Sequence, residues 1–477
     1  MKKLTYLLMV FVLGTNLAHA KSVTLIVAQE VAENFYKQNS KQIISNVSLA
    51  YLETTSEGEA VFYAFNINEN GGFVIVTADD NARPIIGYST QGQFVYPKAK
   101  TNIAYWLNIR KNEIMDMRKN NSLANEEITH EWKTYSTCTN SQNTRSLMAV
   151  APLIQTTWDQ GQYYNTLCPS NSLTGCGATA MAQIMKFWNY PTTGIGSSSY
   201  CDCTSGGFAS NYGTLSADYG TATYNWSNMP LNVSSANNDV ATIMYHCGVS
   251  IQTDYSPNGS YSYMLSMENP TACSQIAYVD YFKYDPSTLQ GLYKSDYTNS
   301  DWTALLKNDL DIGRPIHYFG TEAQGGHFWV CDGYDSNNNF HFNWGWSGSD
   351  DGYFALNNLT TGSGSYTYNP VDEQSVLIGI QPIGSGTTGL EVKNSSGELS
   401  IYPNPASSTL TITGNNHHGK IHFALYDVTG REVKTDEINE TEGAFNETIA
   451  INNLSNGMYI LKASDEKNVW IKKLEVK

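Results

Sequence analysis

Two polar segments with little hydrophobic periodicity divide the 477-residue chain, and this division limits the fold more than any other feature. The first segment is residues 120–146, and the second is a short glycine-rich run at 384–389. Such segments rarely contribute to a core, and a chain of this length has room for about two to four domains. We therefore predict a leader, three folding units and a linker with these bounds: 1–20, 21–145, 146–384, 385–394 (the linker) and 395–477.

The first residues have the layout of a secretory signal peptide. A basic start at Lys2 and Lys3 is followed by a mostly apolar run at 4–17 and by the small-x-small sequence AHA at 18–20. The apolar run is too short to span a bilayer, and no later run reaches the roughly 18–20 apolar residues of a membrane helix. We therefore expect an exported chain without a membrane span.

The charge balance excludes two classes of partner. Lys and Arg total 28 against 44 Asp and Glu, which gives a formal net charge of -16. Nucleic-acid binding needs a basic face and docking on anionic lipid needs basic clusters, so we expect neither nucleic acid nor a membrane as partner. The hydrophobic fraction of 41% is high enough for buried cores.

The chain has eight cysteines, which could form disulfides or supply a reactive thiol. Disulfides are usual in exported proteins, but seven cysteines follow residue 145, and an odd number leaves at least one thiol unpaired. The sequence does not give the pairing of the others. Cys201, Cys203, His246 and Cys247 match no known zinc-ligand spacing, so we expect disulfides or buried thiols there and no metal or other cofactor.

The two outer parts differ in their secondary-structure patterns. Residues 28–38 and 105–119 show helical periodicity and 72–77 reads as a strand, so the N-terminal part is predicted to mix helices and strands. Residues 395–477 contain short strands separated by turns with Asn and Gly, which is typical of a small β-sandwich.

One cysteine in the middle part lies where a nucleophile could be activated. Apolar residues recur at helical spacing after Thr174, namely Ala178, Met181, Ala182, Met185 and Trp188. Cys176 is at the start of this predicted helix, where N–H groups and the helix dipole stabilise a thiolate. Gly175 and Gly177 flank it and allow close approach of a substrate backbone. A disulfide or a small buried residue is the alternative.

A predicted hairpin supplies a matching base. Residues 324–333 and 340–346 read as two strands joined by a turn rich in Asp and Asn. With the hairpin centred on Asp335, His327 and Asn343 lie opposite each other, with Cβ atoms about 4.5–5.5 Å apart. An Asn amide at that position orients the imidazole and selects its tautomer, as a thiol nucleophile requires.

Two neighbouring residues bear on this pair. Trp344 follows Asn343 and could shield the imidazole–amide hydrogen bond from water. His341 shares the face of Asn343 but lacks flanking glycines, and it stays as a rival base. A purely structural role for His327 in its strand is the other alternative.

The order of these residues along the chain matches a known arrangement. His327 and then Asn343 follow Cys176 at a distance close to the roughly 130–150 residues of papain-like enzymes. Gln160 lies upstream in the sequence WDQG and is a candidate hydrogen-bond donor to an oxyanion, beside the Cys176 N–H. A glutamine in a surface loop is the alternative.

The middle part resembles the streptopain family of papain-like cysteine peptidases. The similar pieces are VAPLIQTTWDQGQYYN (150–165), GCGATAMAQIMKFWNYP (175–191), GGHFWVCDGY (325–334) and FHFNWGWSGSDDGYF (340–354). The resemblance implies an α+β fold with a papain-like, two-subdomain catalytic core. It also implies an endopeptidase made as a zymogen, without a cofactor and with a preference for hydrophobic P2 residues. By position it assigns Cys176 as nucleophile, His327 as base, Asn343 as its orienting residue, Gln160 as oxyanion donor and Trp344 as cover of the His–Asn pair.

Both flanking parts also resemble known domains. Residues 21–145 are similar to the inhibitory propeptide of that family, above all at 71–89, which implies maturation near residues 145–149. Residues 395–477 resemble the C-terminal sorting domain of the type IX secretion system of Bacteroidetes, as in IYPNPASSTLTI (401–412) and LSNGMYILK (454–462). This second resemblance implies recognition by the secretion machinery and export through both membranes, with release or surface attachment.

These observations favour a secreted cysteine endopeptidase that acts on protein or peptide substrates and is inhibited by its own propeptide. A non-catalytic surface adhesin on a peptidase scaffold is the alternative from another class. A thiol acyl-transferase is a third hypothesis, and analysis of products formed with an added amine distinguishes it from a hydrolase.

Overall fold

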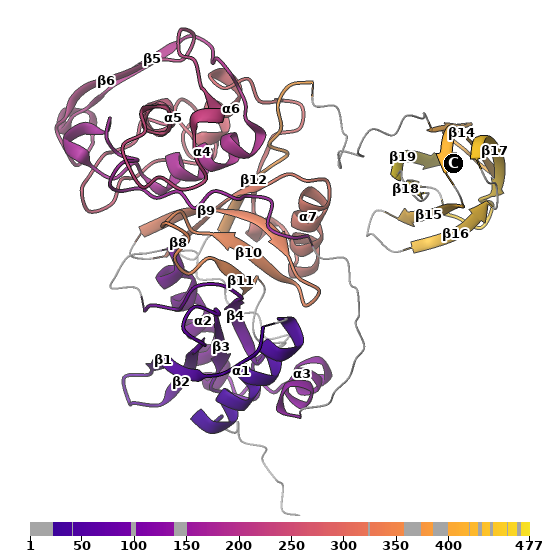
Figure 1. Cartoon of the computed structure of the whole chain (residues 1–477), viewed down its shortest axis with the longest axis horizontal. Coiled ribbons are helices and arrows are strands. Elements are labelled where there is room, and N and C mark those ends of the chain that lie inside the picture. The colour runs from indigo at the N-terminus through magenta and orange to yellow at the C-terminus, as the bar shows by residue number, and fades with distance from the viewer. Residues whose placement is uncertain are drawn as a thin grey trace, which may run out of the picture. The chain divides into compact units, whose positions relative to one another are not determined.

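The computed structural model describes most of the chain (Figure 1). The described residues are 22–40, 42–96, 102–137, 150–322, 325–356, 374–384, 399–418, 420–427, 432–438, 442–455, 457–464 and 469–477. The predicted signal peptide, the maturation junction predicted at 145–149 and the predicted linker at 385–394 lie outside these residues.

The chain divides into two compact units that do not follow the order of the sequence. Unit 1 comprises the N-terminal part up to residue 148 together with 321–327 and 335–373. Unit 2 comprises 149–320, 328–334 and the C-terminal part from residue 374. Strand β9 (Gly325–Tyr334) therefore begins in unit 1 and continues in unit 2.

Unit 1 contains an antiparallel sheet with the strand order β1-β2-β3-β4-β11-β10. Its strands are β1 (Val47–Thr54), β2 (Ala60–Ile67), β3 (Phe73–Thr77), β4 (Ile85–Ser89), β10 (Asn339–Asn343) and β11 (Gly352–Ala355). Pairing of β4 with β11 joins distant parts of the sequence, with Tyr88 opposite Tyr353 and Gly87 opposite Phe354. A Cβ atom on Gly87 would lie 2.4 Å from Cδ1 of Phe354, so this contact requires glycine.

Two helices of unit 1, α1 (Leu25–Asn39) and α3 (Glu126–Ser136), cover the same face of this sheet (Figure 1). They share one core with strands β2 and β3, which includes Phe35, Tyr36, Phe65, Val74, Ile128 and Trp132. A third helix, α2 (Asn102–Lys119), places the ring of Trp106 5.1 Å from that of Phe342 in β10. The predicted helices at 28–38 and 105–119 and the predicted strand at 72–77 are confirmed.

Helix α3 lies in the segment that the sequence analysis treats as a linker, so that prediction is wrong for residues 126–136. Asn125 caps the helix, because its side chain accepts the N–H of Ile128 at 2.9 Å. Ile128, Trp132 and Tyr135 are buried at i, i+4 and i+7. Both signals are visible in the sequence, but three apolar residues among many charged ones form a weak stripe.

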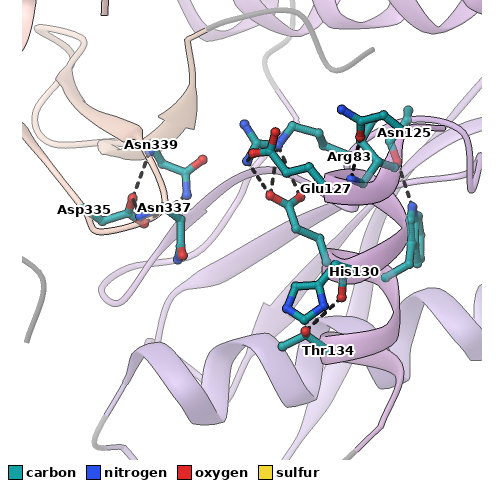
Figure 2. Close-up of polar contacts among 12 residues, drawn as sticks. Arg83, Asn125, Glu127, His130, Thr134, Asp335, Asn337 and Asn339 are labelled. Atoms are coloured by element: carbon teal, nitrogen blue, oxygen red, sulfur yellow. Dashed lines mark hydrogen bonds and ion pairs between the residues drawn. The ribbon is translucent and has the colours of Figure 1, made fainter. Parts of the chain in front are cut away.

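An ion-pair network holds α3 against the loop between β3 and β4. Arg83 pairs with Glu127 at 3.3 Å and also with Glu131, as Figure 2 shows for Arg83 and Glu127. The indole N–H of Trp132 donates to the carbonyl oxygen of Ala82 at 2.7 Å. Helix α3 is therefore a packed part of unit 1 and not a linker.

Unit 2 is built on helices and a smaller sheet. Its helices are α4 (Cys176–Trp188), α5 (Asn238–Ser250), α6 (Ser274–Asp280) and α7 (Asn299–Asp311), with 3-10 turns η1 (Pro169–Asn171), η2 (Thr204–Gly206), η3 (Trp226–Asn228) and η4 (Lys294–Asp296). Strands β9, β8 (Ile316–Glu322), β12 (Gln374–Ile378) and β7 (Gln290–Tyr293) follow one another in the sheet, and β5 (Ser197–Asp202) pairs with β6 (Gly213–Asp218). Helix α4 is buried in the core of this unit. Within the described ranges, no helix is long and apolar enough to cross a membrane.

The C-terminal residues form two sheets around one core. One sheet contains β13 (Leu399–Tyr402), β14 (Thr409–His418) and β17 (Glu442–Ala450); the other contains β16 (Glu432–Ile438), β15 (Ile421–Asp427), β18 (Gly457–Ser464) and β19 (Val469–Val476). Leu410 and Phe445 of the first sheet belong to the same buried cluster as Phe423 and Leu461 of the second. The predicted β-sandwich is therefore confirmed.

The cysteines form fewer disulfides than an exported chain leads one to expect. Among the described residues Cys201 pairs with Cys203, while Cys168, Cys247, Cys273 and Cys331 are buried free thiols and Cys176 is a half-buried one. These four buried side chains fill small spaces in the core of unit 2, as apolar residues do. Cys138 lies outside the described residues.

Two histidines of unit 2 make its stability depend on pH. His317 in β8 is fully buried, and burial lowers its pKa from 6.5 to about 3. His246 in α5 accepts or donates one hydrogen bond with the hydroxyl of Tyr224 at 2.9 Å, and burial lowers its pKa to about 4, against the opposing charge of Asp218. Both are neutral in the folded chain at pH 5, whereas the unfolded chain binds protons there.

We expect the free energy of unfolding to fall as the pH drops below about 6.5. Because the folded pKa is depressed, His317 alone should remove about 2 kcal/mol between pH 6.5 and pH 5. Urea unfolding of the full chain at both pH values measures this loss. In a His317→Leu variant the loss should be smaller by that amount, and an unchanged pH dependence would contradict the assignment.

Candidate active site

The first turn of α4 is built around two glycines. Gly175 precedes the helix with a φ of 91°, and a Cβ atom there would lie 3.3 Å from Cβ of Ser260. A Cβ atom on Gly177 would lie 2.7 Å from Oγ of Ser262. The glycines therefore let the chain's own segment at 260–262 approach the helix start, where Cys176 is the first helical residue.

The sulfur of Cys176 is surrounded by backbone donors. Burial raises the pKa of its thiol, and the nearby backbone N–H groups of Phe328, Gly177 and Cys176 itself oppose that rise. The prediction that the helix start lowers the pKa of Cys176 is therefore wrong for the uncut chain. Burial destabilises the thiolate more than these N–H groups stabilise it. Phe328 is the residue that follows His327 in β9.

Gln160 is also in unit 2, close in the structure to the start of α4. Its side chain is only 3% exposed, which excludes the alternative of a surface-loop glutamine. The backbone carbonyl oxygen of Gln160 accepts the N–H of Thr174 at 3.0 Å, and Thr174 lies two residues before Cys176. Within the described part of the chain, the amide nitrogen Nε2 is buried without a hydrogen-bond partner. Because a buried donor without an acceptor is costly, this nitrogen is suited to an acceptor that arrives from outside the chain.

His327, Asn343 and Trp344 lie in unit 1. The half-buried ring of His327 is 5.9 Å from the ring of Tyr105 in α2. Asn343 ends β10, is 3% exposed and accepts the N–H of Gly345 at 3.1 Å. These contacts hold the two polar side chains in defined places within the same unit.

Trp344 is fixed by both its backbone and its ring. Its backbone N–H donates to Oδ1 of Asp351 at 2.8 Å, and its indole N–H donates to the carbonyl oxygen of Asp350 at 3.1 Å. Its ring lies 5.1 Å from that of Phe342 and 5.2 Å from that of Phe354. The indole is therefore a rigid, buried wall next to Asn343 in the sequence.

The hairpin between β9 and β10 exists, but its centre differs from the prediction. The N–H of Asp335 donates to the carbonyl oxygen of Asn339 at 2.9 Å, so the turn is centred on Asn337 and not on Asp335. The predicted pairing of His327 with Asn343 stays a prediction, whereas the predicted turn centre is wrong. The reason is the Asp335 carboxylate, which accepts the N–H groups of Asn337 and Asn339 at 2.8 Å each (Figure 2).

The rival base His341 has a different environment. It lies opposite Tyr353 in the β10–β11 pair, with ring centroids 5.1 Å apart. It is half-buried in the middle of β10, whereas His327 is near the start of β9 beside the residue that contacts the Cys176 sulfur.

Helix α2 makes contacts around the hairpin that the sequence analysis missed. The hydroxyl of Tyr105 donates to the carbonyl oxygen of Thr321 at 2.9 Å, close to its ring contact with His327. Arg110 is buried with Glu113 at 3.0 Å. Helical periodicity identified which face of α2 is buried. It did not show that this face packs against β9 and β10, because these strands are more than 200 residues away in the sequence.

Comparison with known proteins gives family matches to three parts of the chain. The model of the Peptidase C10 family matches residues 158–354, that of the Spi protease inhibitor matches 20–114, and that of the Secretion system C-terminal sorting domain matches 400–477. Streptopain of Streptococcus pyogenes is 31% identical over 346 residues, which cover 67% of this chain and 80% of that protein.

Two further relatives extend these matches. The thiol protease/hemagglutinin PrtT of Porphyromonas gingivalis is 29% identical over 446 residues, covering 88% of this chain but 47% of that protein, so the chain spans about half the length of this relative. Among solved structures, a fragment of prointerpain A from Prevotella intermedia aligns with a TM-score of 0.55 and 28% identity, covering 70% of this chain and 99% of the fragment.

Proposed function

Because the chain belongs to the peptidase C10 family, whose members include streptopain, we propose that it hydrolyses peptide bonds with Cys176 as the nucleophile. The observation that carries this proposal is the Phe328 N–H, which lies close enough to the Cys176 sulfur to lower the thiol pKa. It sets the nucleophile candidate beside the residue that follows His327 in β9. A sulfur at a helix start and an imidazole, here carried by β9, are the two groups that thiol catalysis needs.

In the proposed reaction His327 takes the thiol proton while the sulfur attacks the carbonyl carbon of the scissile bond. The carbon–sulfur bond forms and the carbonyl oxygen becomes an oxyanion. When the carbon–nitrogen bond breaks, the imidazolium returns the proton to the leaving amine, which leaves an acyl-thioenzyme. Water activated by His327 then hydrolyses that thioester and restores the thiol.

Gln160 is proposed to stabilise the oxyanion together with the Cys176 N–H. Support comes from its buried amide nitrogen, which has no acceptor among the residues that the structure describes. A donor that is already in place, in a site shielded from water, stabilises negative charge without the cost of reorganisation.

Asn343 and Trp344 are proposed to hold the base in its productive orientation. Asn343 is buried at the end of β10, and Trp344 is fixed by hydrogen bonds to Asp351 and Asp350. An amide partner selects the imidazole tautomer, and an apolar wall keeps water from competing for that hydrogen bond.

The N-terminal part is proposed to keep the enzyme latent through its contacts in unit 1. Support comes from the match to the Spi protease inhibitor and from three contacts: β4 with β11, Trp106 with Phe342, and Tyr105 with His327. Addition of a strand to an exposed sheet edge is a common way to bind an extended segment. Cleavage between α3 and residue 150 would separate this part from the catalytic residues.

Substrate preference and export complete the proposal. The sorting domain at 400–477 implies export, and we propose passage through both membranes with release or surface attachment. The substrates are proteins or peptides, with a preference for a hydrophobic P2 residue that a peptide library would test.

Iodoacetamide provides the first test of this function. The processed chain should hydrolyse casein, and iodoacetamide should abolish that activity while peptide mapping finds the label on Cys176, because among the described thiols four are buried and this one is half-buried. With an added amine, the main products should still be free carboxylic acids. Amide products would instead indicate an acyl-transferase, and full activity after labelling would indicate a different nucleophile.

A further inference from the structure

A strap of irregular backbone, residues 150–160, leads to Gln160. At its first end it is fixed to β9: the N–H of Val150 donates to the carbonyl oxygen of Tyr334 at 3.0 Å. The N–H of Ile154 donates to Oδ2 of buried Asp332 at 2.7 Å. No regular secondary structure holds residues 151–159. Their path is set by isolated backbone hydrogen bonds, such as that from the Thr157 N–H to the Leu231 carbonyl oxygen at 2.8 Å, and by side-chain contacts.

One face of α4 supplies those contacts at the other end of the strap. Cys176, Thr179 and Gln183 are spaced i, i+3 and i+7, so they share one side of the helix. Gln183 is fully buried, and its Oε1 accepts the hydroxyl of Thr156 at 2.9 Å and the N–H of Trp158 at 3.3 Å. A single side-chain oxygen thus binds the strap at two positions just before Gln160.

A second clamp acts one turn closer to the nucleophile. The hydroxyl oxygens of Thr179 and Thr174 are 2.8 Å apart, and the N–H of Thr174 donates to the carbonyl oxygen of Gln160 at 3.0 Å. Both clamps therefore run from the Cys176 face of α4 to the backbone that carries Gln160.

From this arrangement we propose that Gln183 is a positioning residue that sets where the Gln160 amide lies relative to the Cys176 sulfur. The inference rests on the proposed function, in which Gln160 donates to the oxyanion. In this role Gln183 acts through its hydrogen bonds with Thr156 and Trp158. A displacement of about 1 Å at an oxyanion donor is enough to lower the rate by about a hundredfold.

The first experiment replaces Gln183 by methionine, which has a similar length but no oxygen acceptor. In the full chain, processed with added trypsin, Gln183→Met should lower kcat for a peptide substrate about ten- to a hundredfold and leave KM within about threefold. Ile184→Val, a buried change on the same helix without a hydrogen bond, is the matched control and should lower kcat less than about twofold. Thr156→Val removes one of the two donors and should give a smaller fall in kcat, so it decides the question if Gln183→Met does not fold.

Two readouts separate positioning from a general loss of structure. Alkylation of Cys176 by iodoacetamide needs no oxyanion donor, so its rate should stay within about threefold of wild type. In a Gln160→Ala background, Gln183→Met should have little further effect on kcat, because the group it positions is absent. A fall in alkylation that matches the fall in kcat, or effects of the two substitutions that multiply, would overturn the inference.

Failure of the proposed function would look different from failure of this inference. It would appear as hydrolysis that survives complete alkylation of Cys176 in the wild-type chain. An unchanged kcat in Gln183→Met, with wild-type hydrolysis still sensitive to iodoacetamide, would refute the positioning role alone.

Discussion

Replacement of Cys176 by alanine is expected to lower kcat/KM of the processed chain by about 10⁴-fold or more. The substitution removes the atom that forms the acyl intermediate, and the remaining groups bind and polarise the substrate without covalent catalysis. Hydrolysis of a fluorogenic peptide, followed to high enzyme concentration, measures the residual rate. The chain should remain folded, because alanine fits the helix start and the side chain is only half-buried.

A matched thiol provides the control. Cys247 in α5 is fully buried, with its sulfur 3.7 Å from that of Met185, and Cys247→Ala should keep activity within about twofold of wild type. Activity that survives in Cys176→Ala, or that is lost equally in both variants, would remove the basis for the proposed nucleophile.

Truncation of Trp106 is expected to release the latency of the uncut chain. Trp106 is fully buried in α2 and contacts Phe342 in β10, so its loss should cost about 2–4 kcal/mol of the contact between the N-terminal part and the hairpin strand. That cost corresponds to about a 30- to 1,000-fold larger open fraction. Casein hydrolysis by uncut Trp106→Ala should rise accordingly over uncut wild type, as should the rate at which iodoacetamide labels Cys176.

The design of this experiment separates latency from catalysis. Met115→Ala changes an exposed residue of the same helix and should leave the uncut chain latent. After processing, Trp106→Ala and wild type should be equally active, because Trp106 is then no longer part of the enzyme. Equal latency of all uncut chains would show that this contact does not maintain inhibition.

Local sequence patterns predicted the nucleophile helix well. Apolar residues at helical spacing and Pro191 downstream indicate a helix after Thr174, and α4 runs from Cys176 to Trp188. The glycines beside Cys176 predicted a close approach, but the segment that approaches in the structure is residues 260–262 of the same chain. Helix α4 was predictable because its signals lie within a few turns of chain. The segment that packs against its start, residues 260–262, was not predictable, because it is distant in the sequence.

The hairpin shows where such reasoning stops. Both strands were predicted, but the centre of the turn depends on how the Asp335 carboxylate bonds the backbone of Asn337 and Asn339, and the spacing of turn residues alone did not show this. Similarly, the position of Cys176 at a helix start predicted a lowered thiol pKa. Burial of the sulfur in the folded chain raises that pKa instead.

The sequence by itself determined the residue types, their order and the local elements that carry them, because periodicity, glycine positions and turn residues act over short stretches of chain. Only the tertiary structure decided that the Gln160 amide is buried with no acceptor among the described residues, that Gln183 binds the strap before it, and that β4 pairs with β11. Burial and hydrogen bonding between distant segments depend on how those segments pack, and no local pattern encodes which partner a buried polar atom will meet.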